Sequence, residues 1–301
     1  MKNHYIIPIF LTRQGCKSRC IFCSQEHITT KDELTQDISA KIKHYLSTIP
    51  ESAKNVEAAF YGGTFTGLDF ISQEKLLSQI TPFIKTGLLS GIRIATRPDK
   101  INQTQIDFLK SFHVKTVELG VESMNDRVLK NSHVKMMASL LPDFVRIHPV
   151  LVLKGSGLET LYKQGKYKPL TLQKAVNNCL FFLNEMEKKN IKVIRIGLYP
   201  SDELRTMGVI IAGPFHQAFG ELVIDEKFYR IITKEKEKKT YKNSILEIKS
   251  NQKDSSAIRG QHKINIKHLK KKYGFMDIKI SENIKMKRGS IGLFRSDIKI
   301  T

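Results

Sequence analysis

Short runs of apolar, β-branched residues alternate with helical patterns along most of the chain, and this alternation limits the folds open to it. Six runs are typical of strands, and four longer stretches with apolar residues three and four apart are typical of helices. The expected strands are Tyr5–Leu11, Val56–Tyr61, Gly91–Thr96, Val114–Gly120, Asp143–Leu153 and Ile191–Leu198, and the expected helices are Leu34–Ser47, Gln73–Lys85, Gln103–Phe112 and Leu172–Lys189. Alternating strands and helices favour a parallel sheet with helices outside it, so we expect an α/β fold.

The loops that follow the first four strands carry the residues most suggestive of chemistry. A cysteine cluster follows the first strand, and the glycine-rich segment YGGTFTG (61–67) follows the second. Arg97 and Asp99 follow the third strand, and Glu122 follows the fourth. Because the carboxyl ends of parallel strands lie at one edge of a sheet, these loops should converge. The sequence therefore predicts one site at that edge.

The cysteine cluster has the spacing C-x3-C-x2-C, formed by Cys16, Cys20 and Cys23. Three thiolates in one tight loop repel each other unless they bind a metal or a cluster. A four-iron cluster held here by thiolates would keep one iron without a protein ligand. Zinc is an alternative, because His27 could complete a Cys3His tetrahedron. The crowding of three cysteines argues against a disulfide framework, and Cys179 lies in an apolar helical pattern that predicts a core thiol.

The segment CKSRCIFC resembles the signature of the radical S-adenosylmethionine (radical SAM) enzymes. In that superfamily three cysteines hold a [4Fe–4S] cluster, and the amino and carboxylate groups of S-adenosylmethionine chelate the free iron. An electron from the cluster then cleaves the sulfonium to give a 5′-deoxyadenosyl radical. The resemblance thus implies both cofactors and a low-potential electron donor as a partner.

The same resemblance assigns further residues. The superfamily holds the methionine amino group with a glycine motif at the position of the second loop, and it places an aromatic residue near the adenine. Arg97 and Glu122 are expected to bind the cofactor or to lie at the rim, and Phe22 has a core role as its alternative. The implied cofactor-binding residues are Phe22, Gly62, Gly63, Thr64, Arg97 and Glu122.

The resemblance extends over roughly residues 5–225. The segments AFYGGTFTG, GIRIATRPD, VKTVELGVESM, PDFVRIHPVLVLKGSGL, VIRIGLYP and AGPFHQAFGEL resemble the bacterial relatives of the catalytic subunit of the Elongator complex. Members of that family modify wobble uridines in tRNA and carry an acetyltransferase domain, for which we see no acetyl-coenzyme A motif. The implied activity is therefore radical SAM chemistry on RNA, most directly tRNA, without support for acetyl transfer.

One segment departs from the family pattern. After residues 122–132 the family continues through a helix, a strand and another helix, whereas here only residues 133–141 precede the next shared segment. A βαβ unit takes about 30 residues or more, so we expect at least one strand with its crossover to be missing. The end of that strand normally contacts the adenine, so the barrel should be partial and its cofactor affinity reduced.

The net charge of +21 is concentrated near the C-terminus. Residues 231–301 hold 19 lysines and arginines against 7 aspartates and glutamates. Such a block favours a polyanionic partner, most naturally nucleic acid. The alternative is that biased base composition has produced lysines that only solvate a surface.

This C-terminal segment has a pattern of its own. The turn Gly260-Gln261-His262-Lys263 separates two expected helices. The order of elements resembles a minimal KH-type RNA-binding module, whose GxxG loop clamps a nucleic-acid backbone, although Lys263 replaces the final glycine. An ordinary helix–turn–helix packing element is the alternative. The expected elements are a strand at Ser244–Ser250, helices at Asp254–Arg259 and Ile264–Tyr273, and a strand at Met276–Ile280, with Lys263, Lys267, Lys270 and Lys271 suited to phosphate contact.

We therefore expect a partial (β/α) radical SAM barrel at residues 1–230 and a small basic α+β KH-like domain at residues 231–301. Lys154 and Arg195 could face the substrate, and His216 is a third candidate polar group near the site. The simpler interpretations are a solvated rim lysine, a structural arginine and a buried, hydrogen-bonded histidine.

A rival interpretation comes from another class of protein. In it the chain is an RNA-binding protein that keeps the cluster or a zinc site as a structural element and has lost catalysis. The missing strand favours this rival, whereas the cysteine triplet and the GGT loop favour the enzyme. No apolar run is long enough to span a bilayer, and no secretory signal is seen, so we expect a cytoplasmic protein without a membrane partner.

Overall fold

The computed structural model describes residues 4–11, 14–15, 20–24, 37–121, 144–198, 202–234, 241–242 and 244–297. The chain divides into two compact units. The first comprises Met1–Thr171 and Glu185–Phe215, and the second comprises Leu172–Asn184 and His216–Thr301. The boundary expected between residues 230 and 231 falls inside helix α10 (Phe219–Lys234), which belongs to the second unit.

The first unit is built on a six-stranded sheet in the order β1-β2-β3-β4-β5-β7. Every neighbouring pair is parallel, which confirms the expected partial barrel. The strands are β1 (His4–Phe10), β2 (Asn55–Tyr61), β3 (Gly91–Thr96), β4 (Val114–Val121), β5 (Phe144–Ile147) and β7 (Lys192–Ile196). Strand β4 pairs directly with β5, and no strand of the described residues lies between them. The segment expected to be shortened, residues 122–143, lies outside the described residues.

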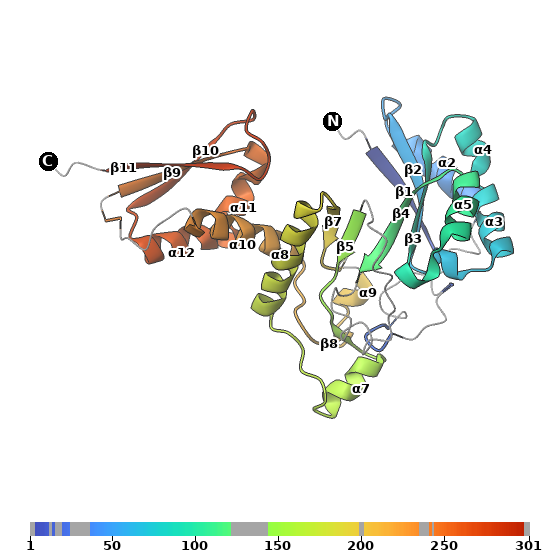
Figure 1. Cartoon of the computed structure of the whole chain (residues 1–301), viewed down its shortest axis with the longest axis horizontal. Helices are drawn as coiled ribbons and strands as arrows, with labels where there is room; N and C mark the ends of the chain where they lie inside the picture. Colours follow the sequence, from blue (N-terminus) through green and yellow to red (C-terminus); the bar gives the residue numbers. More distant parts are fainter. Residues whose placement is uncertain are drawn as a thin grey trace. The chain divides into compact units, whose positions relative to one another are not determined.

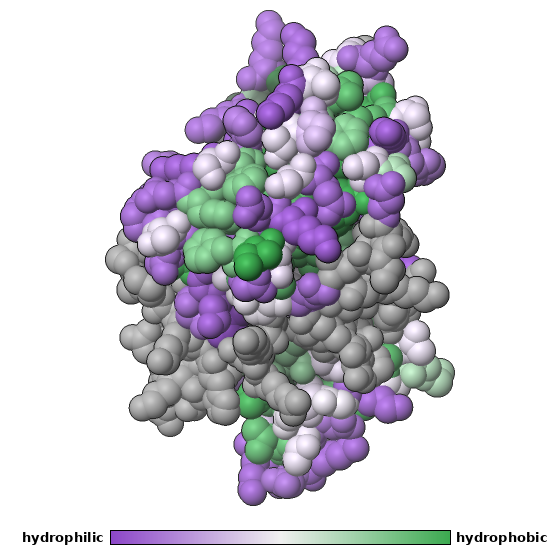
Figure 2. Space-filling view, turned by 90° about the vertical axis from the view of Figure 1, so that its right-hand side faces the viewer, coloured by the Kyte–Doolittle hydropathy of each residue, from purple (hydrophilic) through white to green (hydrophobic). Residues whose placement is uncertain are grey.

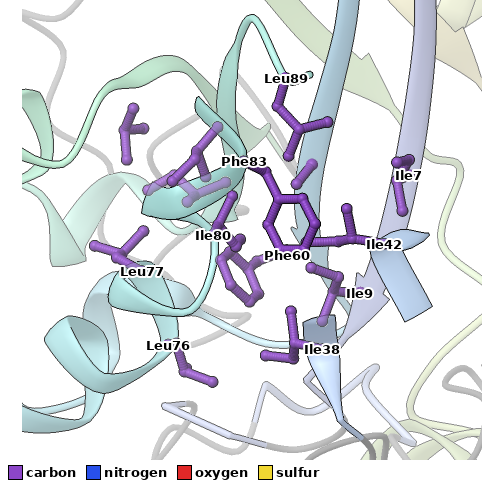
Figure 3. Packing of buried hydrophobic residues seen from close by; sticks show 14 of the residues in the cluster. Ile7, Ile9, Ile38, Ile42, Phe60, Leu76, Leu77, Ile80, Phe83 and Leu89 are labelled. Atoms are coloured by element: carbon purple, nitrogen blue, oxygen red, sulfur yellow. The ribbon is translucent and has the colours of Figure 1, made fainter. Parts of the chain in front are cut away.

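Helices cover one face of this sheet (Figure 1). They are α2 (Ile38–Thr48), α3 (Phe70–Ser78), α4 (Thr81–Lys85) and α5 (Gln103–Ser111). Figure 3 shows side chains of β1 and β2 pointing toward those of α2, α3 and α4 in a fully apolar core. The core positions alternate along β1, β2 and β3, as in Val56, Ala58 and Phe60 of β2. Residues between them therefore point to the opposite face of the sheet.

Two expected elements of the first unit are interrupted, and prolines explain both breaks. The strand expected at Asp143–Leu153 is two strands, β5 and the short β6 (Val152–Leu153), because Pro149 between them has no N–H to pair. The helix expected at Gln73–Lys85 is α3 followed by α4, and Pro82 lies in the first turn of α4. The remaining elements are α7 (Gly157–Lys163), α9 (Asp202–Arg205) and β8 (Ile210–Ala212), which pairs antiparallel with β6.

The second unit has helices on one side of a three-stranded sheet (Figure 1). Its sheet order is β10-β9-β11, with β10 parallel and β11 antiparallel to β9. The order strand, helix, turn, helix, strand confirms the expected KH-like arrangement, while α10 and β11 were not predicted. The elements are α8 (Leu172–Lys188, shared with the first unit), α10, β9 (Ser244–Ser250), α11 (Ser255–Arg259), α12 (Ile264–Tyr273), β10 (Asp277–Glu282) and β11 (Ile291–Asp297).

The exposed surface is largely hydrophilic where the described residues can be followed. Figure 2 shows this in its upper part, where a few apolar side chains are grouped among polar ones. Among the described residues, no helix combines the length and the apolar character that crossing a bilayer requires.

Candidate active site

The cysteine loop forms a tight turn beside the sheet. The Cys23 N–H donates to the Cys20 carbonyl at 3.0 Å, and both thiols are partly exposed. Phe22 lies between them and is also partly exposed. Cys16 and the alternative ligand His27 lie outside the described residues. The turn therefore presents two of the three expected ligand thiols together.

This cysteine turn is anchored to the segment that follows β6. The Ser24 hydroxyl donates to the Lys154 carbonyl at 2.8 Å, and the Leu158 N–H donates to the Ile21 carbonyl at 2.6 Å. Both bonds join residues more than a hundred positions apart, so the fold itself sets the position of the turn. Lys154 is exposed beside it.

Glycines let the loop after β1 approach the loop after β2. The Thr64 N–H donates to the Gln14 carbonyl at 3.0 Å. A Cβ added at Gly63 would lie 2.5 Å from the Leu11 carbonyl oxygen, and one at Gly15 would lie 2.0 Å from the Thr64 carbonyl oxygen. Only glycine allows backbones this close. Gly62 has a φ of +82°, which side chains disfavour. These contacts give the glycines a packing role, and the expected contact with a cofactor stays a prediction.

Arg97 lies at the end of β3 and connects the third loop to the cysteine turn. Its guanidinium donates to both carboxylate oxygens of Asp99, at 2.8 and 3.0 Å. Its Nη1 donates to the Cys20 Sγ at 3.4 Å. A fixed cation beside a sulfur stabilises the thiolate form. The donor set of soft thiolates with a cationic second contact fits an iron–sulfur cluster.

A chain of buried charges crosses the inner face of the half-barrel, opposite the helices. Arg93 of β3 binds Glu57 of β2 at 2.7 Å and Glu118 of β4 at 2.9 Å. Glu118 also pairs with Arg146 of β5. The side chains of Glu57, Arg93 and Glu118 are each at most 7% exposed. Tyr61, at the end of β2, donates its hydroxyl to Glu118 at 3.1 Å. Charges of alternating sign thus lie on four consecutive strands.

The surroundings of this chain of charges shift the pKa values of its neighbours. Burial, reinforced by the negative charge of Glu118, raises the pKa of Tyr61 to about 12, so its hydroxyl stays protonated. Burial works to raise the pKa of Glu57, but its bonds to Arg93 and His4 outweigh it and hold that pKa below the usual range. Burial and the cations Arg146 and Arg195 together lower the pKa of His148 to about 4, so that imidazole is neutral.

The other expected site residues fall in different places. Arg195 is exposed on β7 and lies opposite Arg146 in register, so both belong to the inner face. His216 belongs to the second unit, where its Nδ1 accepts from the Ala218 N–H at 3.1 Å just before α10. His216 is therefore hydrogen-bonded, as the simpler interpretation has it, but it is only partly buried. Glu122 lies outside the described residues.

Sequence reasoning missed the chain of charges, although a signal for it was present. Each of its four members is a single charged residue with an apolar residue on both sides, within a predicted strand. Period-two alternation places such a residue on the face opposite the apolar core. Four such positions on consecutive strands, alternating in sign, would have predicted a polar inner face.

Comparisons with known proteins agree with this geometry. The family model described as the radical SAM superfamily matches residues 11–137, and the radical SAM C-terminal domain matches residues 142–230. Elongator complex protein 3 of Saccharomyces cerevisiae is 25% identical, with 41% of this chain and 33% of that protein aligned. An uncharacterised protein of Methanocaldococcus jannaschii is 23% identical, with 57% of this chain and 69% of that protein aligned.

Two solved structures were also matched. The archaeal Methanocaldococcus infernus Elp3 with an N-terminal deletion gives a TM-score of 0.49 at 18% identity, covering 78% of this chain and 63% of that one. Coproporphyrinogen III oxidase (HemN) from Escherichia coli gives 0.39 at 14% identity, covering 76% and 52%. The chain spans about a third of the length of the yeast protein. The matches to the superfamily and to its C-terminal domain show that this chain belongs to the radical SAM superfamily, and the yeast Elongator protein is among the relatives that it resembles.

Proposed function

We propose that this radical SAM enzyme acts on RNA, most directly tRNA, through a 5′-deoxyadenosyl radical. The observation that carries the proposal is the cysteine turn held at the carboxyl edge of the sheet, with Arg97 donating to Cys20. Membership of the superfamily implies a [4Fe–4S] cluster and S-adenosylmethionine as cofactors. When bound, the two together would supply the electron and the radical.

The residues of the chain would bind and orient the cofactors and shield them from water. Cys16, Cys20 and Cys23 are the expected cluster ligands, and Arg97 would keep the Cys20 sulfur in its thiolate form. The loop of Gly62, Gly63 and Thr64 lies against the loop after β1, where the superfamily binds the methionine end of its cofactor. Protein groups in such enzymes supply binding, orientation and exclusion of water, while the cofactor supplies the chemistry.

The inner face offers groups that could position a substrate. Tyr61 is a protonated donor, and the Arg146 guanidinium lies 4.8 Å from the centre of its ring. Arg195 stands beside Arg146 in register, and Lys154 stands at the cysteine turn. Arg146 is already paired with Glu118, whereas Arg195 and Lys154 are exposed and suit the phosphates of a nucleotide. A low-potential electron donor would complete the system.

Two features support RNA as the substrate class. The likeness to the Elongator catalytic subunit implies chemistry on wobble uridines of tRNA. The second unit is strongly basic, and its strand–helix–helix–strand order is that of a KH-like module. An excess of exposed cations attracts a polyanion before any specific contact forms.

The test is anaerobic reconstitution with iron and sulfide, followed by measurement of 5′-deoxyadenosine released from S-adenosylmethionine. Because we expect the strand that normally reaches the adenine to be missing, we predict slow release alone and faster release with bulk tRNA. Cluster assembly and tRNA binding without any release would contradict the proposal and support an RNA-binding protein that has lost catalysis.

Cysteine variants separate the cluster ligands from the core thiol. We expect Cys16→Ala, Cys20→Ala and Cys23→Ala each to abolish iron binding, measured by iron analysis and by the visible absorption of the protein. Cys179→Ala is the matched control, because Cys179 is 5% exposed and burial raises its pKa to about 11. One equivalent of tight zinc in a colourless protein would contradict the assignment.

A further inference from the structure

The sheet of the second unit has one face that its helices do not cover. Leu246 and Ile248 of β9 are fully buried in one apolar cluster with Leu269 of α12, and the helices of this unit lie on one side of the sheet (Figure 1). Alternate residues of β9 therefore point the other way, and these are Ile245, Glu247 and Lys249. This outward side of β10-β9-β11 is called the open face below.

An exposed aromatic ring lies on the edge strand β11 of the open face. Phe294 of β11 stands opposite Glu247 in register, and its side chain is 50% exposed. The Lys249 ammonium lies 4.5 Å from the centre of its ring. Lys279 of β10 stands opposite Glu247 on the other side. The open face thus carries one aromatic ring on its edge strand, with Lys249, Lys279 and the carboxylate of Glu247 on the two strands to one side of it.

Gly292 determines how this ring is presented. A Cβ at Gly292 would lie 3.0 Å from Cε2 and 3.5 Å from Cζ of Phe294. The far edge of the ring therefore extends back over Gly292, along the strand, where any other residue would push it away. Side chains on strands usually stand roughly perpendicular to the sheet. A ring lying along the strand offers its face to a flat partner.

A basic loop of fixed shape adjoins the end of the sheet that carries Lys249 and Gly292. It joins β10 to β11 and includes Lys285, Lys287 and Arg288, with no acidic residue between 283 and 290. The buried Asn251 side chain donates to the carbonyls of Ile284 and Met286, at 3.3 and 2.8 Å. The loop begins next to β9, since the Asn283 N–H donates to the Ser250 carbonyl at 2.8 Å.

A second buried polar residue fixes the far side of this loop. Asp254 is 2% exposed, and its two carboxylate oxygens accept from the Arg288 Nε and the Gly289 N–H, each at 2.8 Å. Lys285 and Lys287 are exposed on the loop so held. A loop already ordered loses little entropy when it binds a phosphate.

The groups of the GQHK turn, by comparison, already have hydrogen-bond partners within the protein. The Gln261 N–H donates to the Asp225 carboxylate at 2.9 Å, and the Gln261 side chain donates to Glu221 at 3.4 Å. The Lys263 N–H donates to the Gly260 carbonyl at 3.0 Å. Two amides that a GxxG loop could offer to a phosphate are thus occupied, one of them by a carboxylate that would repel it.

We propose that the open face and its basic loop form a binding surface for single-stranded RNA. Phe294 stacks on a base, and Lys249, Lys279, Lys285 and Lys287 contact the phosphates of the neighbouring nucleotides. Bases stack on aromatic side chains in a sequence-tolerant way, and adjacent cations track the backbone. This inference rests on the proposed action on RNA and assigns it a surface distinct from the GQHK turn.

Fluorescence offers a direct test, because the chain contains no tryptophan. Phe294→Trp in the full-length protein introduces one reporter, and we expect a 12-nucleotide oligouridylate to quench its emission. Phe181→Trp is the matched control, since Phe181 is an exposed residue of α8 in the same unit, 68% exposed. Unchanged emission of the Phe294→Trp protein at saturating oligouridylate overturns the proposal.

Affinity measurements separate stacking from charge. Phe294→Leu keeps an apolar side chain but not the ring, and we expect about 5- to 100-fold weaker oligouridylate binding with an unchanged salt slope. Reversal of Lys249, Lys285 and Lys287 to Glu should flatten that slope by about 2. If reversal of Lys263, Lys267 and Lys271 weakens oligouridylate binding as much, the open face is not the site.

The same samples distinguish this inference from the proposed function. Release of 5′-deoxyadenosine stimulated by tRNA, together with unquenched Phe294→Trp, overturns the open-face surface alone. Quenching by oligouridylate without any release overturns the proposed function and leaves the surface in place.

Discussion

The two units of the molecule use charged side chains in opposite ways. On the inner face of the first unit, Glu57, Arg93, Glu118 and Arg146 alternate in sign on four consecutive strands and neutralise each other. In the second unit, residues 241–297 carry 14 lysines and arginines against 5 aspartates and glutamates. A buried ion pair is stable only while both partners are present, whereas an exposed excess of positive charge acts by attracting anionic molecules. The paired charges of the first unit therefore stabilise the geometry of the inner face, and the excess charge of the second unit favours binding of a polyanion.

The largest effect should come from removing the centre of the buried chain of charges. Arg93→Met leaves Glu57 and Glu118 buried with one cation fewer, which typically costs about 3–5 kcal/mol of unfolding free energy. Arg230→Met is the matched control in the second unit, where Arg230 pairs with Glu226 and its side chain is 50% exposed. An exposed pair contributes below about 1 kcal/mol. Equal losses of the two variants in urea unfolding would remove the contrast between the units.

Acid should affect the two units in opposite directions. The pKa of Glu57 is lowered, so its contribution to stability is present above its ordinary pKa of 4.5 and is lost as the pH falls. Burial and then Glu221 raise the pKa of Asp225 from 3.8 to about 6, against the bond from Gln261. The second unit should therefore lose up to roughly 3 kcal/mol between pH 4 and pH 7 through this group.

Asp225→Asn isolates the second of these effects. The amide oxygen can still accept from the Gln261 N–H, and no charge is buried at neutral pH. We expect hydrogen exchange from α12 to be slower in this variant than in the native chain at pH 7, with little difference at pH 4. Faster exchange at both pH values would mean that the ionised carboxylate is needed.

Replacing Tyr61 tests how much its hydrogen bond to the buried charges of the inner face contributes to stability. Tyr61→Phe removes a hydroxyl donor to the charged Glu118, and hydrogen bonds to charged groups contribute about 1.5–3 kcal/mol. The control is Tyr273→Phe in the second unit, whose hydroxyl donates to the neutral Thr233 carbonyl at 3.3 Å, so its loss should cost under about 1 kcal/mol. Thermal unfolding of both variants gives the difference, and a smaller loss for Tyr61→Phe would show that the inner face is more hydrated than its burial indicates.

Much of the fold was predictable because local patterns and topology agree in it. The six apolar runs correspond to the six strands of the parallel sheet, and the edge at which they end was expected to gather the loops. The breaks at Pro82 and Pro149 could also have been predicted, because proline interrupts helices and strands, but the expected helix and strand were drawn through both residues. β11 was missed because Gly292, Arg295 and Ser296 interrupt its apolar alternation.

The site was less predictable, because its contacts join residues far apart in the chain. The spacing of the cysteines indicated a cluster, but nothing local placed Ser24 on the Lys154 carbonyl or Arg97 on Cys20. The turn at Gly260 was recognised as a possible phosphate clamp from its spacing. Its engagement by Asp225 came from α10, which the sequence analysis did not predict.

The smallest expected effect concerns three exposed lysines in α12 and in the turn before it. Lys263, Lys267 and Lys271 are exposed, and their reversal to Glu should weaken tRNA binding about tenfold, near 1.4 kcal/mol, at moderate salt. Each neutralised phosphate releases condensed counterions, so the dependence of affinity on salt should also flatten. Iron content should not change, because the expected cluster ligands lie in the first unit.

A control for net charge is available in the first unit, where Lys75, Lys85 and Lys110 are exposed on α3, α4 and α5. Their reversal changes the total charge by the same amount. Because these lysines lie on the helix-covered side of a unit whose inner charges are paired, we expect tRNA affinity and its salt slope to stay close to native values. An equal loss in both triple variants would show that tRNA responds to total charge alone, and the basic second unit would then have no special part in binding.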